Sequence, residues 1–241
     1  METLVLRVRA PQVSFRRPLD INFQRTLPLP PPTTLIGLAG AALGLSDYQI
    51  WNDENWRPLR ELKVASLLLK QPGRGKDMMT VLKIKNNRIE QRSPYFRELL
   101  FDVEYLVIYS GDADLLKRLK NAFNDPFYPL SLGREDELVE IVEMKEIQVS
   151  HGGPTFYGTA IPGDIREYRI EIIDFDNKKK VKLEPAVIEN VPTRFSVQKG
   201  RRVPIKKATL TFLPYLLKVK IADFEQEVFT ISGRNFTWMN Y

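Results

Sequence analysis

Cysteine is absent from the 241 residues, and histidine occurs only once, at position 151. Structural zinc sites, iron–sulfur clusters and thiol nucleophiles require cysteine, and metal sites or acid–base pairs built on several imidazoles require a second histidine. None of these sites can form in this chain. The sequence leaves carboxylate–Mg²⁺ chemistry, the chemistry of lysine, tyrosine or serine, a mechanism that uses His151, and binding without catalysis.

Long hydrophobic runs are also missing. The longest nearly uncharged apolar stretch, residues 35–45, has 11 residues, whereas a membrane-spanning helix needs about 20. Residues 1–4 lack the basic start and apolar run of a signal peptide, and the absence of cysteine fits a reducing compartment. We therefore expect a cytoplasmic protein without a membrane segment. With 43% hydrophobic residues the chain can bury a normal core, so disorder is not expected.

The charges are segregated along the chain, although the net charge is only +6. Residues 57–97 contain 11 basic and 3 acidic side chains, residues 98–150 contain 5 and 12, and residues 190–222 contain eight basic side chains and no acidic one. This separation predicts a surface that binds a polyanion and an acidic surface that could meet a basic protein. A solvated surface would also explain any single run of lysines.

Hydrophobic periodicity over residues 1–150 predicts the order strand, helix, strand, strand, helix, strand. This order is typical of a ferredoxin-like α+β domain, which is also the frame of the RNA-recognition domain. Thr33 or Thr34 is the expected N-cap of the first helix, and Asp112 or Asp114 that of the second. The expected strands cover residues 4–10, 62–69, 101–109 and 138–149. The first expected helix runs to about residue 45, and the second, with its apolar stripe at residues 115–123, ends at Asp125-Pro126.

The second and third of these strands are separated by residues 70–100, a far longer connection than the two to five residues usual in a hairpin. Within it, Asn86-Asn87 is a plausible hairpin turn between residues 80–85 and 88–92. The two arms are basic, so we expect a projecting hairpin that binds a phosphate backbone. Residues 151–241 are expected to form a smaller β-rich domain, with strands at 167–173, 181–188, 208–221 and 225–231.

Several short motifs have both a structural and a functional interpretation. The glycines at positions 37, 40 and 44 match no phosphate-binding loop and are expected to pack closely against the sheet. Residues 131–134, Ser-Leu-Gly-Arg, either form a tight turn or hold a phosphate or base. His151 is expected to be a hydrogen-bonded structural residue. The aromatic residues beside arginine at 15–17 and 95–97 could stack on bases, although the core is the more usual place for them.

Three segments resemble the fifth CRISPR-associated protein family, a branch of the RAMP superfamily. They are residues 4–10, Pro31-Pro32-Thr33-Thr34 with the glycine-rich helix that follows, and residues 128–134, Tyr-Pro-Leu-Ser-Leu-Gly-Arg. The resemblance covers about residues 1–150 and implies a ferredoxin-like domain with a β-hairpin thumb, to which the basic insertion corresponds. It also implies a subunit of the type I interference complex (Cascade) that caps the 5′ handle of the CRISPR RNA.

The resemblance implies protein neighbours as well, namely the backbone and large subunits of the complex. The acidic residues 135–146 offer a surface for such a neighbour. Target DNA is a further partner that the resemblance allows, and no cofactor is expected. One subtype of the family is a metal-independent endoribonuclease that relies on tyrosine, lysine and histidine. Because no Lys–His pair is evident around His151, we expect a non-catalytic binder.

Two alternatives to RNA-handle binding stay open: cleavage of repeat RNA, and a scaffold whose contacts are mainly with protein. The expected RNA contacts are basic side chains of the N-terminal segment and the hairpin, together with the loop before the fourth strand. They are Arg16, Arg17, Lys76, Lys83, Lys85, Arg88, Arg92, Arg97, Gly133 and Arg134.

Overall fold

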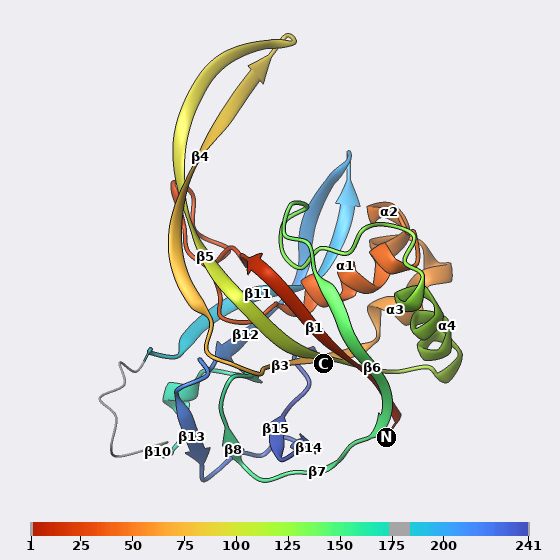
Figure 1. Cartoon of the computed structure of the whole chain (residues 1–241), viewed down its shortest axis with the longest axis vertical. Coiled ribbons are helices and arrows are strands. Elements are labelled where there is room, and N and C mark those ends of the chain that lie inside the picture. The colour runs from red at the N-terminus through yellow and green to blue at the C-terminus, as the bar shows by residue number, and fades with distance from the viewer. Residues whose placement is uncertain (1, 174–183, 241) are drawn as a thin grey trace.

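A six-stranded sheet dominates the computed structural model, which describes residues 2–173 and 184–240 (Figure 1). Four of its strands lie side by side in the order β6-β1-β5-β3, and each neighbouring pair is antiparallel. All four strands expected from the N-terminal periodicity are present, but the third begins at Arg88 rather than at residue 101, because the hairpin arm and the core strand are one continuous element. The four strands are β1 (Glu2–Val13), β3 (Lys63–Leu68), β5 (Arg88–Ser110) and β6 (Glu140–Gln148).

Helices α1 (Pro32–Ala42) and α4 (Ala113–Asn124) pack on one face of this sheet. The expected cap of α4 is confirmed, because the Asp112 carboxylate accepts a hydrogen bond from the Leu115 amide at 2.9 Å. The expected cap of α1 is wrong: Pro31 occupies the N-cap position and no side chain caps the helix. Proline at the first helical position, with its preset φ, starts α1 instead.

The glycines of the α1 segment do not pack against the sheet, which corrects the expectation from sequence. A Cβ on Gly40 would lie 2.4 Å from the Ile50 side chain of α2 (Asp47–Trp51), so this glycine lets two helices approach closely. Gly44 follows α1 with φ of +75° and lies beside Phe127. Gly37 has no atom within 4 Å of a Cβ position. After α2 the chain continues through η1 (Glu54–Trp56) and α3 (Arg57–Arg60) into β3.

The main core lies between the sheet and the helices. Tyr105 and Tyr109 of β5 are fully buried there, as the alternation of residues 101–109 predicts. Their hydroxyls donate hydrogen bonds to the carbonyls of Pro28 (3.0 Å) and Leu35 (2.9 Å), so neither buried hydroxyl lacks a partner. These two bonds fix the segment that leads into α1 over the middle of the sheet.

The basic insertion forms the predicted hairpin, between β4 (Gly73–Lys85) and the first half of β5. Asn86 and Asn87 make its turn with φ of 50° and 59°, the pair of positive values that a type I′ turn requires. The hairpin is not separate from the sheet, because β5 runs without a break from the turn into the core. Pairing of β5 with β1 begins at Leu100, so the preceding residues 88–99 project about 40 Å beyond it. The short β2 (Phe23–Gln24) pairs with this arm near its base. We call residues 73–99 the thumb hairpin (Figure 1).

The C-terminal third is β-rich, as expected, and forms three small three-stranded sheets. Part of the expected strand at 181–188 lies outside the described residues. The expected strand at 208–221 is two elements, the end of β12 and β13, and the boundary at residue 150 stays a prediction. The elements are β7 (Ser150–His151), β8 (Thr155–Phe156), β9 (Ala160–Pro162), η2 (Ile165–Glu167), β10 (Ile170–Ile173), β11 (Val187–Gln198), β12 (Arg201–Phe212), β13 (Lys218–Ile221), β14 (Phe229–Ile231) and β15 (Arg234–Phe236).

Part of this C-terminal third covers the face of the main sheet opposite the helices. Phe229, Phe236 and Trp238 join Val5 and Ile108 in a second buried cluster. The sheet is therefore sandwiched at this end, whereas the β11–β12 hairpin stands beside α1 and α2 (Figure 1). No helix in the described part of the chain is long and apolar enough to cross a bilayer.

Candidate nucleic-acid interface

A groove of about 810 Å³ opens between α1 and the β11–β12 hairpin. Thr34, Gly37 and Ala41, which lie on one side of α1, line it from the helix. Because Gly37 has no side chain and no neighbour within 4 Å of a Cβ, it leaves this side of the groove open. The other lining segments follow β1, form α2, precede β6 and belong to the β11–β12 hairpin. Four stretches that lie far apart in the sequence therefore meet at one concave surface.

Three guanidinium groups reach this groove. Arg16 is exposed, and no carboxylate of the described residues lies within ion-pair distance of it. Arg134 is half-buried and donates a hydrogen bond to the side-chain oxygen of Gln24. Arg202 of β12 is exposed and pairs with both oxygens of Asp47 at 2.6 and 2.8 Å. The groove thus has an excess of positive charge along its rim.

Aromatic and apolar surface lies between these cations. The groove is lined by Phe15, Trp51 and Phe195, which are partly or fully buried, and by Tyr128, whose side chain is 46% exposed. The Trp51 and Phe195 rings contact each other edge to face at 5.3 Å, joining α2 to β11. Only Tyr128 therefore offers an accessible ring on which an unpaired base could stack.

The loop of residues 131–137 is fixed by the buried carboxylate of Glu137. This carboxylate accepts hydrogen bonds from the amide and hydroxyl of Ser14 and from the amide of Arg134, at 2.7 Å for the Ser14 amide and 2.8 Å for Arg134. Gly133 has φ of +124°, and a Cβ on it would lie 2.1 Å from a Glu137 oxygen. The Glu137 amide donates to the Arg134 carbonyl at 3.1 Å, so a tight turn follows the Ser-Leu-Gly-Arg motif at residues 134–137, and Gly133 and Arg134 line the groove beside it.

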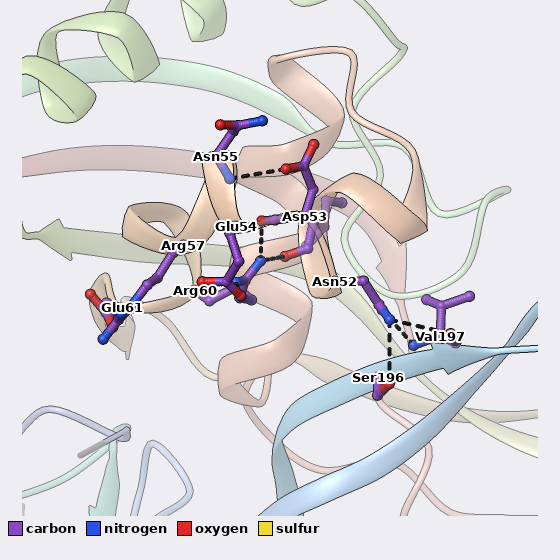
Figure 2. Close-up of polar contacts among 10 residues, drawn as sticks. Asn52, Asp53, Glu54, Asn55, Arg57, Arg60, Glu61, Ser196 and Val197 are labelled. Carbon is purple, nitrogen blue, oxygen red and sulfur yellow. Dashed lines mark hydrogen bonds and ion pairs between the residues drawn. The ribbon is translucent and has the colours of Figure 1, made fainter.

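The helical side of the groove is tied to the β11–β12 hairpin by Asn52, as Figure 2 shows. Its side-chain oxygen accepts a hydrogen bond from the Val197 amide at 2.7 Å. Arg60 supports this segment from within: it donates to the carbonyl of Asp53 at 2.7 Å and pairs with Glu54 at 3.0 Å. Burial, reinforced by the nearby charge of Arg194, lowers the pKa of the Arg60 guanidinium. These contacts hold the two sides of the groove in a fixed relation.

Six of the expected RNA-binding cations lie on the thumb hairpin, and all of them except Arg97 are exposed. Lys76 stands over the Phe23 ring at 5.1 Å. Lys83 and Lys85 share the carboxylate of Glu90 at 3.1 and 3.6 Å. The remaining two exposed cations, Arg88 and Arg92, flank the turn, and no carboxylate of the described residues lies within 4.0 Å of either guanidinium. Both are free of competing anions.

Arg17 and Arg97 are placed differently from the other expected contacts. Arg97 is buried, with its guanidinium 3.0 Å from Asp77 and 3.7 Å from Asp136. Arg17 pairs with Glu189 of β11. Both charges are matched by carboxylates, and unlike the exposed Arg202 these side chains are only 21% (Arg17) and 11% (Arg97) exposed. They therefore join the β11–β12 hairpin and the base of the thumb hairpin to the body. We leave them out of the proposed ligand contacts.

Sequence reasoning missed Arg202, Tyr128 and the whole β11–β12 side of the groove. The basic run of residues 190–222, which lacks acidic side chains, was the signal that pointed toward this hairpin. His151 lies elsewhere, on β7, and does not line the groove. Its expected hydrogen bond is not found among the described residues, and its ring stacks on Phe229 at 6.0 Å.

Comparison with known proteins places these features in a family. The model of the family described as "CRISPR-associated protein (Cas_Cas5)" matches residues 3–202, which include the thumb hairpin and every segment that lines the groove except Pro204. No curated protein matches the sequence.

Several solved structures are similar to this chain. One described as a "CRISPR RNA-guided surveillance complex" is 18% identical, with a TM-score of 0.53 over 93% of this chain and 91% of that chain. A CRISPR protein from Archaeoglobus fulgidus is 12% identical, with a TM-score of 0.53 over 98% of each chain. A third, described as a Cas protein, is 26% identical, with a TM-score of 0.39, over 56% of this chain and 58% of that one. The first two show the same mixed α+β architecture, and the span of the family model establishes that this chain belongs to the Cas5 family of CRISPR-associated proteins.

Proposed function

We propose that this chain is a non-catalytic, RNA-binding subunit of a CRISPR effector complex, and that it caps the 5′ handle of the CRISPR RNA. Its neighbours in the complex would be the backbone and large subunits, with target DNA close by. Family membership and the shared fold with a chain of a solved surveillance complex support this placement. The observation that carries the RNA-binding part is the groove beside α1, where Arg16, Arg134 and Arg202 surround aromatic surface.

RNA would contact two regions of the chain, the groove and the thumb hairpin. In the groove, an unpaired base would lie against Tyr128 while guanidinium groups pair with the flanking phosphates. Along the thumb hairpin, Arg88 and Arg92 would contact further phosphates, because neither has a carboxylate partner within residues 2–173 and 184–240. A single strand can follow this path because its bases are free to turn toward either region.

A ferredoxin-like frame is part of the same proposal. The strand order β6-β1-β5-β3, with α1 between β1 and β3 and α4 between β5 and β6, supports it. In this frame the two helices, α1 and α4, lie on the same face of the sheet. The opposite face carries the second buried cluster around Trp238, which supports RNA contacts through loops and hairpins rather than through an open sheet.

The position of the single histidine supports the proposal of binding without cleavage. A general acid or base must lie within hydrogen-bond reach of the group that it protonates or deprotonates. His151 stacks on Phe229 and lies outside the groove lining, so RNA held in the groove would not reach it. Purified chain incubated with repeat RNA without metal should leave the RNA intact. Cleavage that is lost in His151→Ala would instead support an endoribonuclease.

The RNA-binding proposal is tested by titrating single-stranded repeat RNA with the full chain at several salt concentrations. The logarithm of the association constant should fall linearly with the logarithm of salt concentration, by about 0.7 for each phosphate contacted. RNA with the handle sequence scrambled should bind more weakly at equal salt, because base contacts in the groove would be lost. Absent or salt-insensitive binding would reject the proposal. If Arg88→Glu/Arg92→Glu left RNA binding in the assembled complex unchanged, the alternative of a scaffold that mainly contacts protein would replace the RNA-binding proposal.

A further inference from the structure

The two outer edges of the main sheet, β3 and β6, differ in whether other parts of the chain cover them. Along β3, the Val64 carbonyl accepts from the Met239 amide at 3.0 Å, and the Val64 amide donates to the Asn240 side chain at 2.9 Å. Further along β3, the Leu68 amide donates to the Gly158 carbonyl at 2.7 Å. The chain thus covers this edge with its own backbone and side chains. At the other edge, β6 pairs only with β1, and no other strand of the described residues pairs with it (Figure 1).

The open edge of β6 is long enough to pair with another strand. Residues 138 and 139 just before it are already bonded to residues 130 and 131, so the free edge begins at Glu140 and runs to Gln148. Nine residues span about 30 Å, with one irregularity at Val142, where the register with β1 shifts between Arg7 and Val8. In an antiparallel edge strand about half of the backbone amides and carbonyls point away from the paired neighbour. Such a row of free groups is a template for an added strand.

The charge around this edge restricts what can occupy it. Residues 135–148 carry six acidic side chains and one basic side chain, and of the six only Glu137 is buried. On β6 itself Glu143 pairs with Lys145 at 2.5 Å and Glu146 with Lys120 at 2.6 Å, so the exposed charge along this edge stays negative. A second copy of β6 would set like charges opposite each other, which destabilises strand pairing. A nucleic-acid backbone would be repelled for the same reason. A strand that carries lysine or arginine would find complementary charges.

Two cavities flank the same strand and could receive side chains of an added segment. A cavity of about 250 Å³ lies at the end of β6, where Thr3, Leu116 and Ile147 are among its lining residues. A cavity of about 660 Å³ lies at the start, where Phe101 and Leu138 are 37% and 54% exposed. In strand addition, backbone hydrogen bonds supply affinity and such pockets supply specificity.

We propose that β6 is completed in the assembled complex by an extended, lysine- or arginine-containing segment of a neighbouring protein subunit. This segment pairs with the free backbone edge of Glu140–Gln148 and places apolar side chains in the flanking cavities. The inference rests on the proposed membership of a multisubunit complex and is independent of which RNA the groove holds.

Hydrogen exchange provides the first test. In the free chain, the outward-facing amides of β6 should exchange rapidly, and in the purified complex they should be protected at least tenfold. Because the chain lacks cysteine, Val142→Cys gives a single thiol on β6, where the native side chain is 40% exposed, for attachment of a photo-crosslinker. The cross-linked product should be a basic peptide of another subunit. Unchanged exchange at β6, or cross-links only to RNA or to a second copy of this chain, would overturn the inference.

A charge reversal provides the second test. Glu140→Lys/Glu143→Lys should reduce incorporation into the complex at least tenfold. The matched control is Glu225→Lys/Glu227→Lys, which makes the same charge change at exposed positions before β14. Equal incorporation of the two variants would overturn the inference. Repeat-RNA binding is measured in parallel for the unmodified chain and for each free variant. If the unmodified chain does not bind RNA but β6 is still protected in the complex, only the proposed RNA role is rejected. If RNA binding is normal but β6 is not protected in the complex, only this inference is rejected.

Discussion

Replacing Glu137 by alanine should destabilise the fold and the groove together. The carboxylate has no exposed surface, and it accepts hydrogen bonds from the Ser14 amide, the Ser14 hydroxyl and the Arg134 amide. The Arg97 guanidinium is 3.8 Å away. Removing one partner from such a buried charged network costs about 3–5 kcal/mol, because the remaining donors are left without an acceptor. For a chain of this size each kcal/mol lowers Tm by about 2–4 °C, so Tm should fall by about 6–20 °C.

Thermal and denaturant unfolding of three variants would check this magnitude. Glu137→Gln keeps the shape of the side chain but loses its charge and one acceptor, so it should lie between the wild type and Glu137→Ala. Glu135→Ala, at an exposed position of the same loop, should change the free energy of unfolding by no more than about 0.5 kcal/mol. A Tm of Glu137→Ala within 2 °C of the wild type, taking about 2 °C as the smallest effect of 1 kcal/mol, would refute the reasoning.

Three further predictions concern other parts of the fold. Burial raises the pKa of Tyr105 and Tyr109, so both phenols should ionise only on unfolding. The free energy of unfolding should therefore fall as the pH rises above about 10, the pKa of tyrosine in the unfolded chain. Ultraviolet titration should show two tyrosines that ionise late in the wild type and one in Tyr105→Phe. Full titration of all tyrosines in the folded chain would contradict this. Gly133→Ala should cost about 1–3 kcal/mol, because φ is +124° and a Cβ would lie 2.1 Å from a carboxylate oxygen, whereas Gly153→Ala, in open space, should be nearly neutral in thermal unfolding. Asn52→Ala should speed hydrogen exchange in the β11–β12 hairpin, and unchanged exchange there would show that this contact does not hold the hairpin.

The sequence predicted those parts of the fold that local patterns determine. Strict alternation of side chains placed Tyr105 and Tyr109 in the core, and Asn86-Asn87 identified a turn whose geometry requires positive φ at both positions. The Asp112 cap followed from the same kind of local chemistry. These features depend on a few neighbouring residues, so they can be read without knowledge of the tertiary structure.

The groove could not be predicted in this way, because its lining comes from four distant stretches of chain. The arginines at 17 and 97 show the same limit: in sequence they resemble the other basic residues near aromatic side chains, but folding brings Glu189 to the first and Asp77 to the second. Gly40 looked like a residue that packs on the sheet, and its close neighbour is a side chain of another helix. Long-range contacts decided each of these cases.

The salt dependence of RNA binding by matched variants tests the central claim most directly. Arg16→Ala/Arg134→Ala in the groove and Arg88→Ala/Arg92→Ala on the thumb hairpin should each reduce the slope of log association constant against log salt by about 1.4, that is, two phosphate contacts. The control is Lys63→Ala/Lys117→Ala, which removes two exposed cations from β3 and α4. This control should keep the slope of the wild type. Three equal slopes would show that RNA binds by overall charge alone and would contradict the assignment of the groove and the thumb hairpin as the RNA-binding surface.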